Sequence, residues 1–108
     1  MIRGQVVSVA GGGDFLGKPR PALIVQDELF GEFHPSVTIC PISSHLTGDH
    51  LYRVPIAKGE GTGLRFDSEI EVDKVTTVWA RRIGQHIGHA PDEVMFAVSV
   101  ALRRWMAL

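Results

Sequence analysis

The chain has 108 residues, of which 44% are hydrophobic and 21% are charged, and its formal net charge is -1. These values are typical of a single globular domain over residues 1–108 with a hydrophobic core of its own. They exclude a protein that binds nucleic acid through its overall charge, so any such binding requires a local basic patch. The single cysteine, Cys40, excludes an internal disulfide and fits a reducing compartment.

Neither a bilayer-spanning apolar stretch nor a signal-peptide pattern after Met1 is found in the sequence, so we expect a cytoplasmic protein without a membrane segment. Short β-branched runs separated by glycine- and proline-rich segments predict six strands, at residues 5–10, 21–26, 36–42, 51–56, 68–78 and 83–89. Pro41 lies inside the third run, which indicates a sheet edge or a bulge there.

The segment from Gly11 to Gly17 is glycine-rich and predicts a mobile loop. It is not a phosphate-binding P-loop, because no Gly-Lys-Ser/Thr sequence and no helix follow it.

The run at residues 68–78 is the longest predicted strand. Alternation places Ile70 and Val72 on one face and Glu69, Glu71 and Asp73 on the other. We interpret Glu69 and Glu71 as part of a solvated face and leave the role of Asp73 open. Three carboxylates on one face can also bind a divalent ion, but they match no spaced metal motif, so we predict no metal site.

One convincing helix follows Pro91, which suits a first helical turn, and Asp92 and Glu93 suit the positive end of the helix dipole. The residues that recur at helical spacing and are expected to face the core are Val94, Val98, Ala101 and Trp105. The predicted fold is therefore mainly β: a small, strongly bent sheet or barrel with one C-terminal helix packed on it.

A candidate site follows from the pairing of the second and third strands. Lys18 and Arg20 each precede a proline, so both are expected to be extended. Antiparallel pairing brings Arg20, at the start of one strand, to Ser43 and Ser44, at the end of the next. The loop from Gly11 to Gly17 enters at the same rim. A guanidinium, two hydroxyls and a mobile flap suit a phosphodiester ligand.

Further candidates lie near this rim. Asp73 can act as a base or hold the hydroxyls and Arg20, if its strand borders the rim. His45 follows the third strand and is a possible base, although a lone loop histidine is more often simply exposed. His86 and His89 are three apart on a strand, so we expect them to face opposite sides and not to chelate together. We expect Cys40 to be buried and inert.

Several segments, in this order and spacing, resemble the MazF/PemK toxins of bacterial toxin–antitoxin modules. They are Arg3-Gly4-Gln5-Val6-Val7, Arg20-Pro21-Ala22-Leu23-Ile24-Val25-Gln26, Pro41-Ile42-Ser43-Ser44, Tyr52-Arg53-Val54-Pro55, Asp67-Ser68, Val72-Asp73-Lys74-Val75-Thr76-Thr77-Val78, Arg81-Arg82-Ile83-Gly84 and the helix that opens with Asp92-Glu93. The resemblance implies an SH3-like barrel of the MazF/CcdB type, a homodimer, and inhibition by a cognate antitoxin with which the toxin also binds DNA.

The resemblance also implies an endoribonuclease that needs no metal or other cofactor. In this chemistry the ribose 2′-hydroxyl of single-stranded RNA attacks the neighbouring phosphorus, leaving a 2′,3′-cyclic phosphate and a 5′-hydroxyl. The family's catalytic arginine and hydroxyl residue fall on Arg20 and Ser43. The remaining positions expected to bind substrate are Lys18, Ser44, Asp73 and Lys74.

The chain departs from the family pattern at several points. Ser43 replaces the usual threonine, Gln5 replaces an acidic residue, Glu71 stands where some members carry a basic residue, and glycines replace polar residues of the first loop. Two alternatives stay open. One is a CcdB-like toxin that binds DNA gyrase without catalysis, through an apolar C-terminal end, and the other is an inactive barrel that only binds an antitoxin.

Overall fold

The computed structural model describes residues 1–11 and 18–108. The strands are β1 (Gln5–Val9), β2 (Arg20–Ile24), β3 (Ser36–Ser43), β4 (Arg53–Ile56), β5 (Ser68–Glu71), β6 (Thr76–Trp79) and β7 (Ile83–His89). Three short 3₁₀ helices, η2 (Glu28–Phe30), η3 (Val72–Lys74) and η4 (Ala80–Arg82), and one α-helix, α1 (Asp92–Met106), complete the described elements. The expected flap over the rim falls on residues 12–17, which lie outside the described residues.

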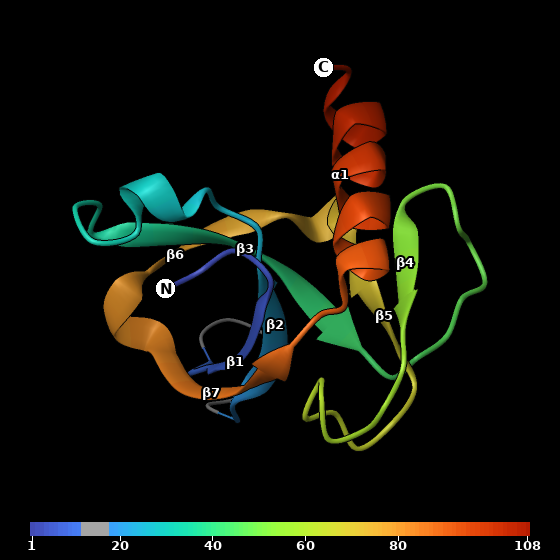
Figure 1. The fold of residues 1–108 in the computed structure, drawn as a ribbon, viewed down its shortest axis with the longest axis horizontal. Coiled ribbons are helices and arrows are strands. Elements are labelled where there is room, and N and C mark those ends of the chain that lie inside the picture. Colours follow the sequence, from blue (N-terminus) through green and yellow to red (C-terminus); the bar gives the residue numbers. More distant parts are fainter. Residues whose placement is uncertain (12–17) are drawn as a thin grey trace.

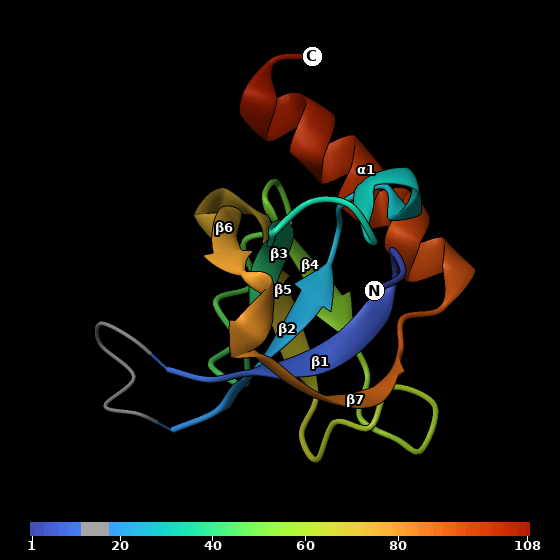
Figure 2. The same ribbon diagram turned by 90° about the vertical axis from the view of Figure 1, so that its left-hand side faces the viewer.

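The strands form one antiparallel sheet in the order β4-β5-β3-β2-β1-β7, with β6 also paired to β3. The sheet curls on itself, and α1 lies against the side that carries β4 and β5 (Figure 1; Figure 2). A bent, mainly β fold with one C-terminal helix was expected from the sequence, and this expectation is confirmed.

The predicted strand at residues 68–78 is wrong as a single strand, because η3 divides it. Ile70 is opposite Ile42 and Thr76 is opposite Ile39, so six steps along one strand match three along the other. The three additional residues are taken up by the 3₁₀ turn. Pro41 lies in β3 opposite this interruption, as expected of a residue that cannot donate to a sheet ladder.

The loop between β4 and β5 closes the barrel against β7. The His89 amide donates to the Gly61 carbonyl at 2.8 Å. A Cβ atom on Gly63 would lie 1.9 Å from the Ile87 carbonyl oxygen, and one on Gly88 would lie 2.2 Å from the Thr62 carbonyl. Gly63 also has φ +74°. The contact between loop and strand is therefore so close that side chains at these positions would prevent it.

The central strands are apolar on both faces, so the barrel has two clusters of buried side chains. One cluster packs under α1 and includes Leu23, Cys40 and Val98; the other, around Val7 and Ile39, packs under β6 and β7. Cys40 is buried, as expected, and burial raises the pKa of its thiol to about 12, which is consistent with the low reactivity predicted for it.

Helix α1 begins one residue after Pro91, which is its N-cap. Val98 and Ala101 are buried as expected, and Val94 packs against the core. The expectation for Trp105 is wrong, because this side chain is 48% exposed. The last turns of α1 extend beyond the sheet (Figure 1), and Trp105 makes an edge contact with Tyr52 instead, with ring centroids 5.6 Å apart.

Glu69 is only 2% exposed, so its assignment to a solvated face is wrong. One carboxylate oxygen accepts hydrogen bonds from the Thr47 amide at 3.0 Å and the Thr47 hydroxyl at 2.9 Å, and the other accepts from the Gly48 amide at 2.9 Å. Burial acts to raise the pKa of Glu69, but these donors and the Arg53 charge lower it overall. The ionised carboxylate therefore holds the loop that follows β3.

Within the described residues, no helix has the length and apolar character needed to cross a membrane.

The contact between the β4–β5 loop and β7 predicts unequal effects of two alanine substitutions. Gly48 and Gly63 share φ +74°, but a Cβ on Gly48 meets nothing within 4 Å. Gly48→Ala is therefore expected to lower the free energy of unfolding by about 1 kcal/mol, from backbone strain alone. Gly63→Ala adds a clash with β7, expected to bring a further ~1–3 kcal/mol. Urea denaturation measures both values, and equal losses would contradict the close packing.

Because the buried Glu69 carboxylate is ionised, we expect the free energy of unfolding to depend on acid pH. Glu69→Gln is expected to lower the free energy of unfolding at neutral pH by about 1.5–3 kcal/mol, because an amide group cannot accept from all three donors. Because the pKa of Glu69 is lower in the folded protein than in the unfolded chain, the ionised carboxylate stabilises the fold at pH values above about 4.3, the ordinary glutamate pKa. This stabilisation is lost as the pH falls through the folded-state pKa. The difference between the two proteins should therefore shrink in acid. A difference that stays constant from neutral pH to pH ~2 would contradict this account.

Candidate functional site

The pairing of β2 with β3 determines the centre of the candidate site. Ala22 is opposite Pro41 and Leu23 is opposite Cys40. The same register, continued by two residues, places Arg20 across from Ser43. The sequence predicted this juxtaposition from antiparallel pairing alone, and the antiparallel pairing is confirmed. The guanidinium and the hydroxyl thus come from neighbouring strand ends at one rim of the sheet.

A pocket of about 980 Å³ opens at this rim. It is lined by side chains from β1, β2, β3 and β5, from the β4–β5 loop and from η3 and β7: Ser8, Lys18, Pro19, Arg20, Pro21, Pro41, Ile42, Ser43, Ser44, Gly63, Leu64, Arg65, Phe66, Ser68, Glu71, Lys74 and Ile87. Four of these described residues are cations and one is a carboxylate. The pocket is therefore positively charged although the whole chain is not.

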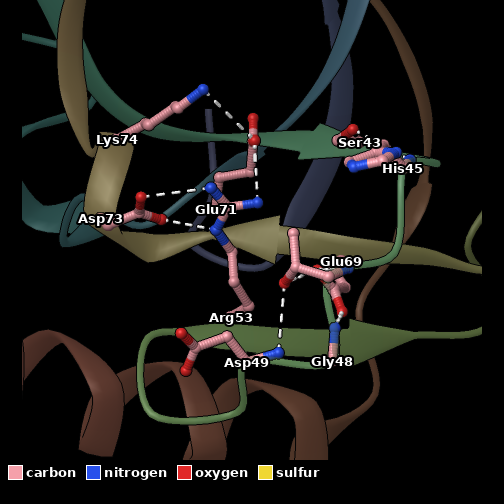
Figure 3. Close-up of polar contacts among 10 residues, drawn as sticks. Ser43, His45, Gly48, Asp49, Arg53, Glu69, Glu71, Asp73 and Lys74 are labelled. Atoms are coloured by element: carbon pink, nitrogen blue, oxygen red, sulfur yellow. Dashed lines mark hydrogen bonds and ion pairs between the residues drawn. The ribbon is translucent and has the colours of Figure 1, made fainter.

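Glu71, the one carboxylate among the described residues that line the pocket, is neutralised by its neighbours. Arg53, opposite Glu71 on β4, approaches it at 3.1 Å, and the Lys74 ammonium lies 3.7 Å from the same oxygen (Figure 3). Arg53 also donates to both oxygens of Asp73, at 2.7 and 3.2 Å. These acceptors raise the pKa of Arg53, with the Asp73 hydrogen bonds as the largest cause. A chain of alternating charges thus runs along the edge of the pocket.

The structure brings together five of the seven residues that the sequence placed in the site: Lys18, Arg20, Ser43, Ser44 and Lys74. Asp73 is not among the described residues that line the pocket. Both of its carboxylate oxygens face Arg53 (Figure 3), so it does not hold Arg20 or the hydroxyls. Its contribution is indirect, since it helps to fix the guanidinium that neutralises Glu71.

His45 also stands apart from the pocket lining in the described part of the chain. Its side chain is exposed, and it contacts the site through the backbone: the His45 amide donates to the Ser43 hydroxyl oxygen at 3.1 Å. A hydroxyl that accepts one hydrogen bond can still donate its proton. Ser43 is therefore held by its own loop while its donor function stays usable toward a ligand.

His86 and His89 do not face opposite sides, contrary to expectation. Their ring centroids are 5.1 Å apart, at 88° to each other. The reason is a bulge in β7, since His89 is opposite Gln5 and His86 is opposite Val7. Because residues 5 and 7 share a face of β1, both histidines share a face of β7. Among residues 1–11 and 18–108, no group of three or more His, Cys, Asp or Glu side chains could hold a metal ion.

Sequence reasoning missed Arg65 and Phe66, which line the pocket from the β4–β5 loop. An adjacent cation and aromatic, next to three closely spaced glycines, was the available signal. Ser8 and Ser68 were also missed, and no sequence pattern singles them out. Together with Arg20, these residues form a wall of cations, hydroxyls and apolar surface that can bind a phosphodiester and the groups attached to it.

Comparisons with known proteins show the family of this chain. The model of the family described as "PemK-like, MazF-like toxin of type II toxin-antitoxin system" matches residues 2–106. A probable endoribonuclease MazF from Mycolicibacterium smegmatis is 36% identical over 102 residues, which cover 94% of this chain and 93% of that protein. Endoribonuclease EndoA from Bacillus subtilis is 27% identical over 96 residues, covering 89% of this chain and 83% of that protein.

Solved structures show the same fold. A mycobacterial endoribonuclease in complex with its cognate antitoxin matches with a TM-score of 0.83 at 18% identity, covering 100% of this chain and 96% of that chain. The Mycobacterium tuberculosis toxin MazF-mt6 matches with a TM-score of 0.80 at 24% identity, covering 98% of each chain. The family model spans nearly the whole described barrel and its helix, and the chain therefore belongs to the PemK-like, MazF-like toxins of type II toxin–antitoxin systems.

Proposed function

We propose that this protein is the toxin of a toxin–antitoxin pair and that it cleaves single-stranded RNA by transesterification without a metal. The observation that carries the proposal is the placement of Arg20 across from Ser43 in a pocket whose described residues include four cations. The family and the 36% identical relative, a probable endoribonuclease, support the reaction class.

The reaction requires the RNA 2′-hydroxyl to attack the adjacent phosphorus as the 5′-oxygen of the next nucleotide leaves. One proton leaves the 2′-hydroxyl and another reaches the 5′-oxygen. Negative charge grows on the non-bridging phosphate oxygens in the transition state, and donors already in place stabilise it without reorganisation. Arg20 is the group suited to this role, because its guanidinium carries a positive charge and can donate two parallel hydrogen bonds.

The Ser43 hydroxyl then holds the phosphate beside Arg20, and Ser44 extends the same edge. Lys18 and Lys74 line the same pocket and supply positive charge, which suits the phosphates next to the cleaved one. Fixing the phosphate between two strand ends also limits rotation about the scissile bond. That restriction favours the in-line geometry that attack by the 2′-hydroxyl requires.

The proposal includes the partners of a toxin of this kind. We propose a cognate antitoxin that binds the toxin and a homodimer as the working form, in the cytoplasm. A mycobacterial relative of the same fold was solved with its cognate antitoxin. An acidic antitoxin segment would complement the cationic pocket, and binding there would prevent RNA from entering.

Substitution of Arg20 tests the catalytic assignment. Arg20→Ala is expected to lower the cleavage rate by at least ~100-fold, since removal of one stabilising donor has effects of about this size. Arg20→Lys keeps the charge but loses the paired donors, so an intermediate rate is expected. The assay is cleavage of a sequence-diverse RNA pool in excess EDTA, with analysis of the product ends for cyclic phosphate and 5′-hydroxyl.

Arg103→Ala is the matched control, because Arg103 is an exposed cation on α1 outside the pocket. It should cleave like the wild type. Wild-type cleavage by a folded Arg20→Ala protein would exclude Arg20 from the reaction, and complete dependence of the wild type on added metal would exclude the metal-free route.

Substitution of Ser43 tests the role of the hydroxyl. Ser43→Thr keeps the hydroxyl and is expected to stay within a few-fold of wild type. Ser43→Ala is expected to lose about 10- to 150-fold in rate, the equivalent of a hydrogen bond of ~1.5–3 kcal/mol to a charged group. Single-turnover rates measure both variants, and thermal unfolding controls for the lost contact with the His45 amide. Equal rates for the two variants would show that the hydroxyl takes no part.

A further inference from the structure

Among the described residues that line the pocket, one is aromatic, and it is exposed. Phe66 lines the pocket and is 65% exposed. Phe33 and Phe96 are exposed too, so exposure alone indicates no function; what distinguishes Phe66 is its position in a positively charged pocket, where the ring is available to a ligand. The neighbouring residue, Arg65, lines the same pocket and is exposed as well. The pair thus presents a flat apolar face and a cation side by side.

The backbone that carries this pair is firmly held. The buried Ser68 hydroxyl donates to the Phe66 carbonyl at 2.8 Å, and the Asp67 carboxylate accepts from the Lys58 amide at 3.0 Å. Gly63, two residues before Arg65, is packed against Ile87 of β7. The position of the ring's backbone is therefore set before any ligand arrives, which reduces the entropy lost on binding.

The pocket is also too large for a phosphate group alone. Its volume of about 980 Å³ lies at the upper end of the ~300–1,000 Å³ range for sites that enclose small organic ligands. Arg20 and Ser43 lie on its strand side, and Arg65 and Phe66 lie on its loop side. A dinucleotide step fits this division, with its phosphate at the strands and its neighbouring base at the loop.

We propose that Phe66 and Arg65 form a nucleotide subsite beside the scissile phosphate. The base of one flanking nucleotide stacks on the Phe66 ring, and Arg65 neutralises the phosphate of that nucleotide. This inference rests on the proposed RNA substrate and adds to it a binding position on the β4–β5 loop. Stacking on an aromatic ring is possible for every base, so the subsite contributes affinity and placement more than sequence choice.

Three variants separate stacking from ordinary apolar contact. Phe66→Leu keeps apolar volume without a flat ring, Phe66→Trp keeps a flat ring, and Phe66→Ala removes both. Stacking energies per base predict that the Leu and Ala variants raise the RNA half-saturation concentration about 5- to 150-fold. The Trp variant should stay within a few-fold of wild type. Maximal single-turnover rates should change little, because the contact exists before and during the reaction.

Changes in the RNA substrate complement the Phe66 variants. An RNA cleaved by the wild type is remade with an abasic ribonucleotide at each position next to the scissile bond. At one position the abasic change should weaken wild-type binding as much as Phe66→Ala does, and should have no further effect on Phe66→Ala. Arg65→Ala should reduce the salt dependence of binding by about 0.7 in the log–log slope, as expected for one single-strand phosphate contact, whereas Arg103→Ala should not.

Several results would overturn the subsite. They are wild-type half-saturation in Phe66→Leu, abasic effects that are identical in wild type and Phe66→Ala, or equal losses in the Trp and Leu variants. If the wild type cleaves no RNA in the pool, the proposed function fails, and the subsite is then judged by binding of single-stranded RNA of mixed sequence. Binding that depends on the ring supports the subsite without catalysis, and absence of binding refutes both.

Discussion

The candidate site depends on the antiparallel pairing of β2 with β3. At the rim, β2 begins with the guanidinium of Arg20 and β3 ends with the hydroxyl of Ser43. A shift of one residue in this register would turn one of the two side chains to the opposite face. The apolar residues of β2 and β3 are buried on both faces, so such a shift would also expose the core. Folding stability and the geometry of the site therefore rely on the same register.

The carboxylates near the pocket are held by hydrogen-bond donors and cations. Glu69, Glu71 and Asp73 all lie near a pocket suited to phosphate, where free carboxylates would repel the ligand. Each is instead held by donors: Glu69 by the loop after β3, and the other two by Arg53. The Arg53 guanidinium is thus the residue that allows Glu71 to line the pocket without opposing an anion.

Features that depend on neighbouring strands were accessible from the sequence. The prolines at Pro19 and Pro21, the antiparallel pairing expected of consecutive strands and the hydroxyls of Ser43 and Ser44 were enough to predict the rim, although the connection between the two strands is long. The interruption of the long strand at residues 68–78 could not be predicted. It arises because η3 forms where the pairing of β3 changes from β5 to β6. Burial of Glu69 likewise depends on a loop that lies 21 and 22 residues away in the sequence and supplies its donors.

The same reasoning explains two further differences. The shared face of His86 and His89 results from a bulge, whose position depends on the pairing of the first and last strands. Arg65 and Phe66 reach the pocket because glycines let their loop pack against β7. In both cases the decisive contact joins segments far apart in the sequence, so no local pattern of residues predicts it.

The single cysteine has a practical consequence. Cys40 is fully buried, and burial raises the pKa of its thiol to about 12, so hardly any thiolate forms near neutral pH. A maleimide or nitroxide reagent would therefore leave the native chain unmodified. A cysteine introduced at an exposed position would then be the one labelled site, with no need to remove the native residue. Distances in the barrel could therefore be measured by electron paramagnetic resonance or fluorescence on labels at introduced cysteines alone.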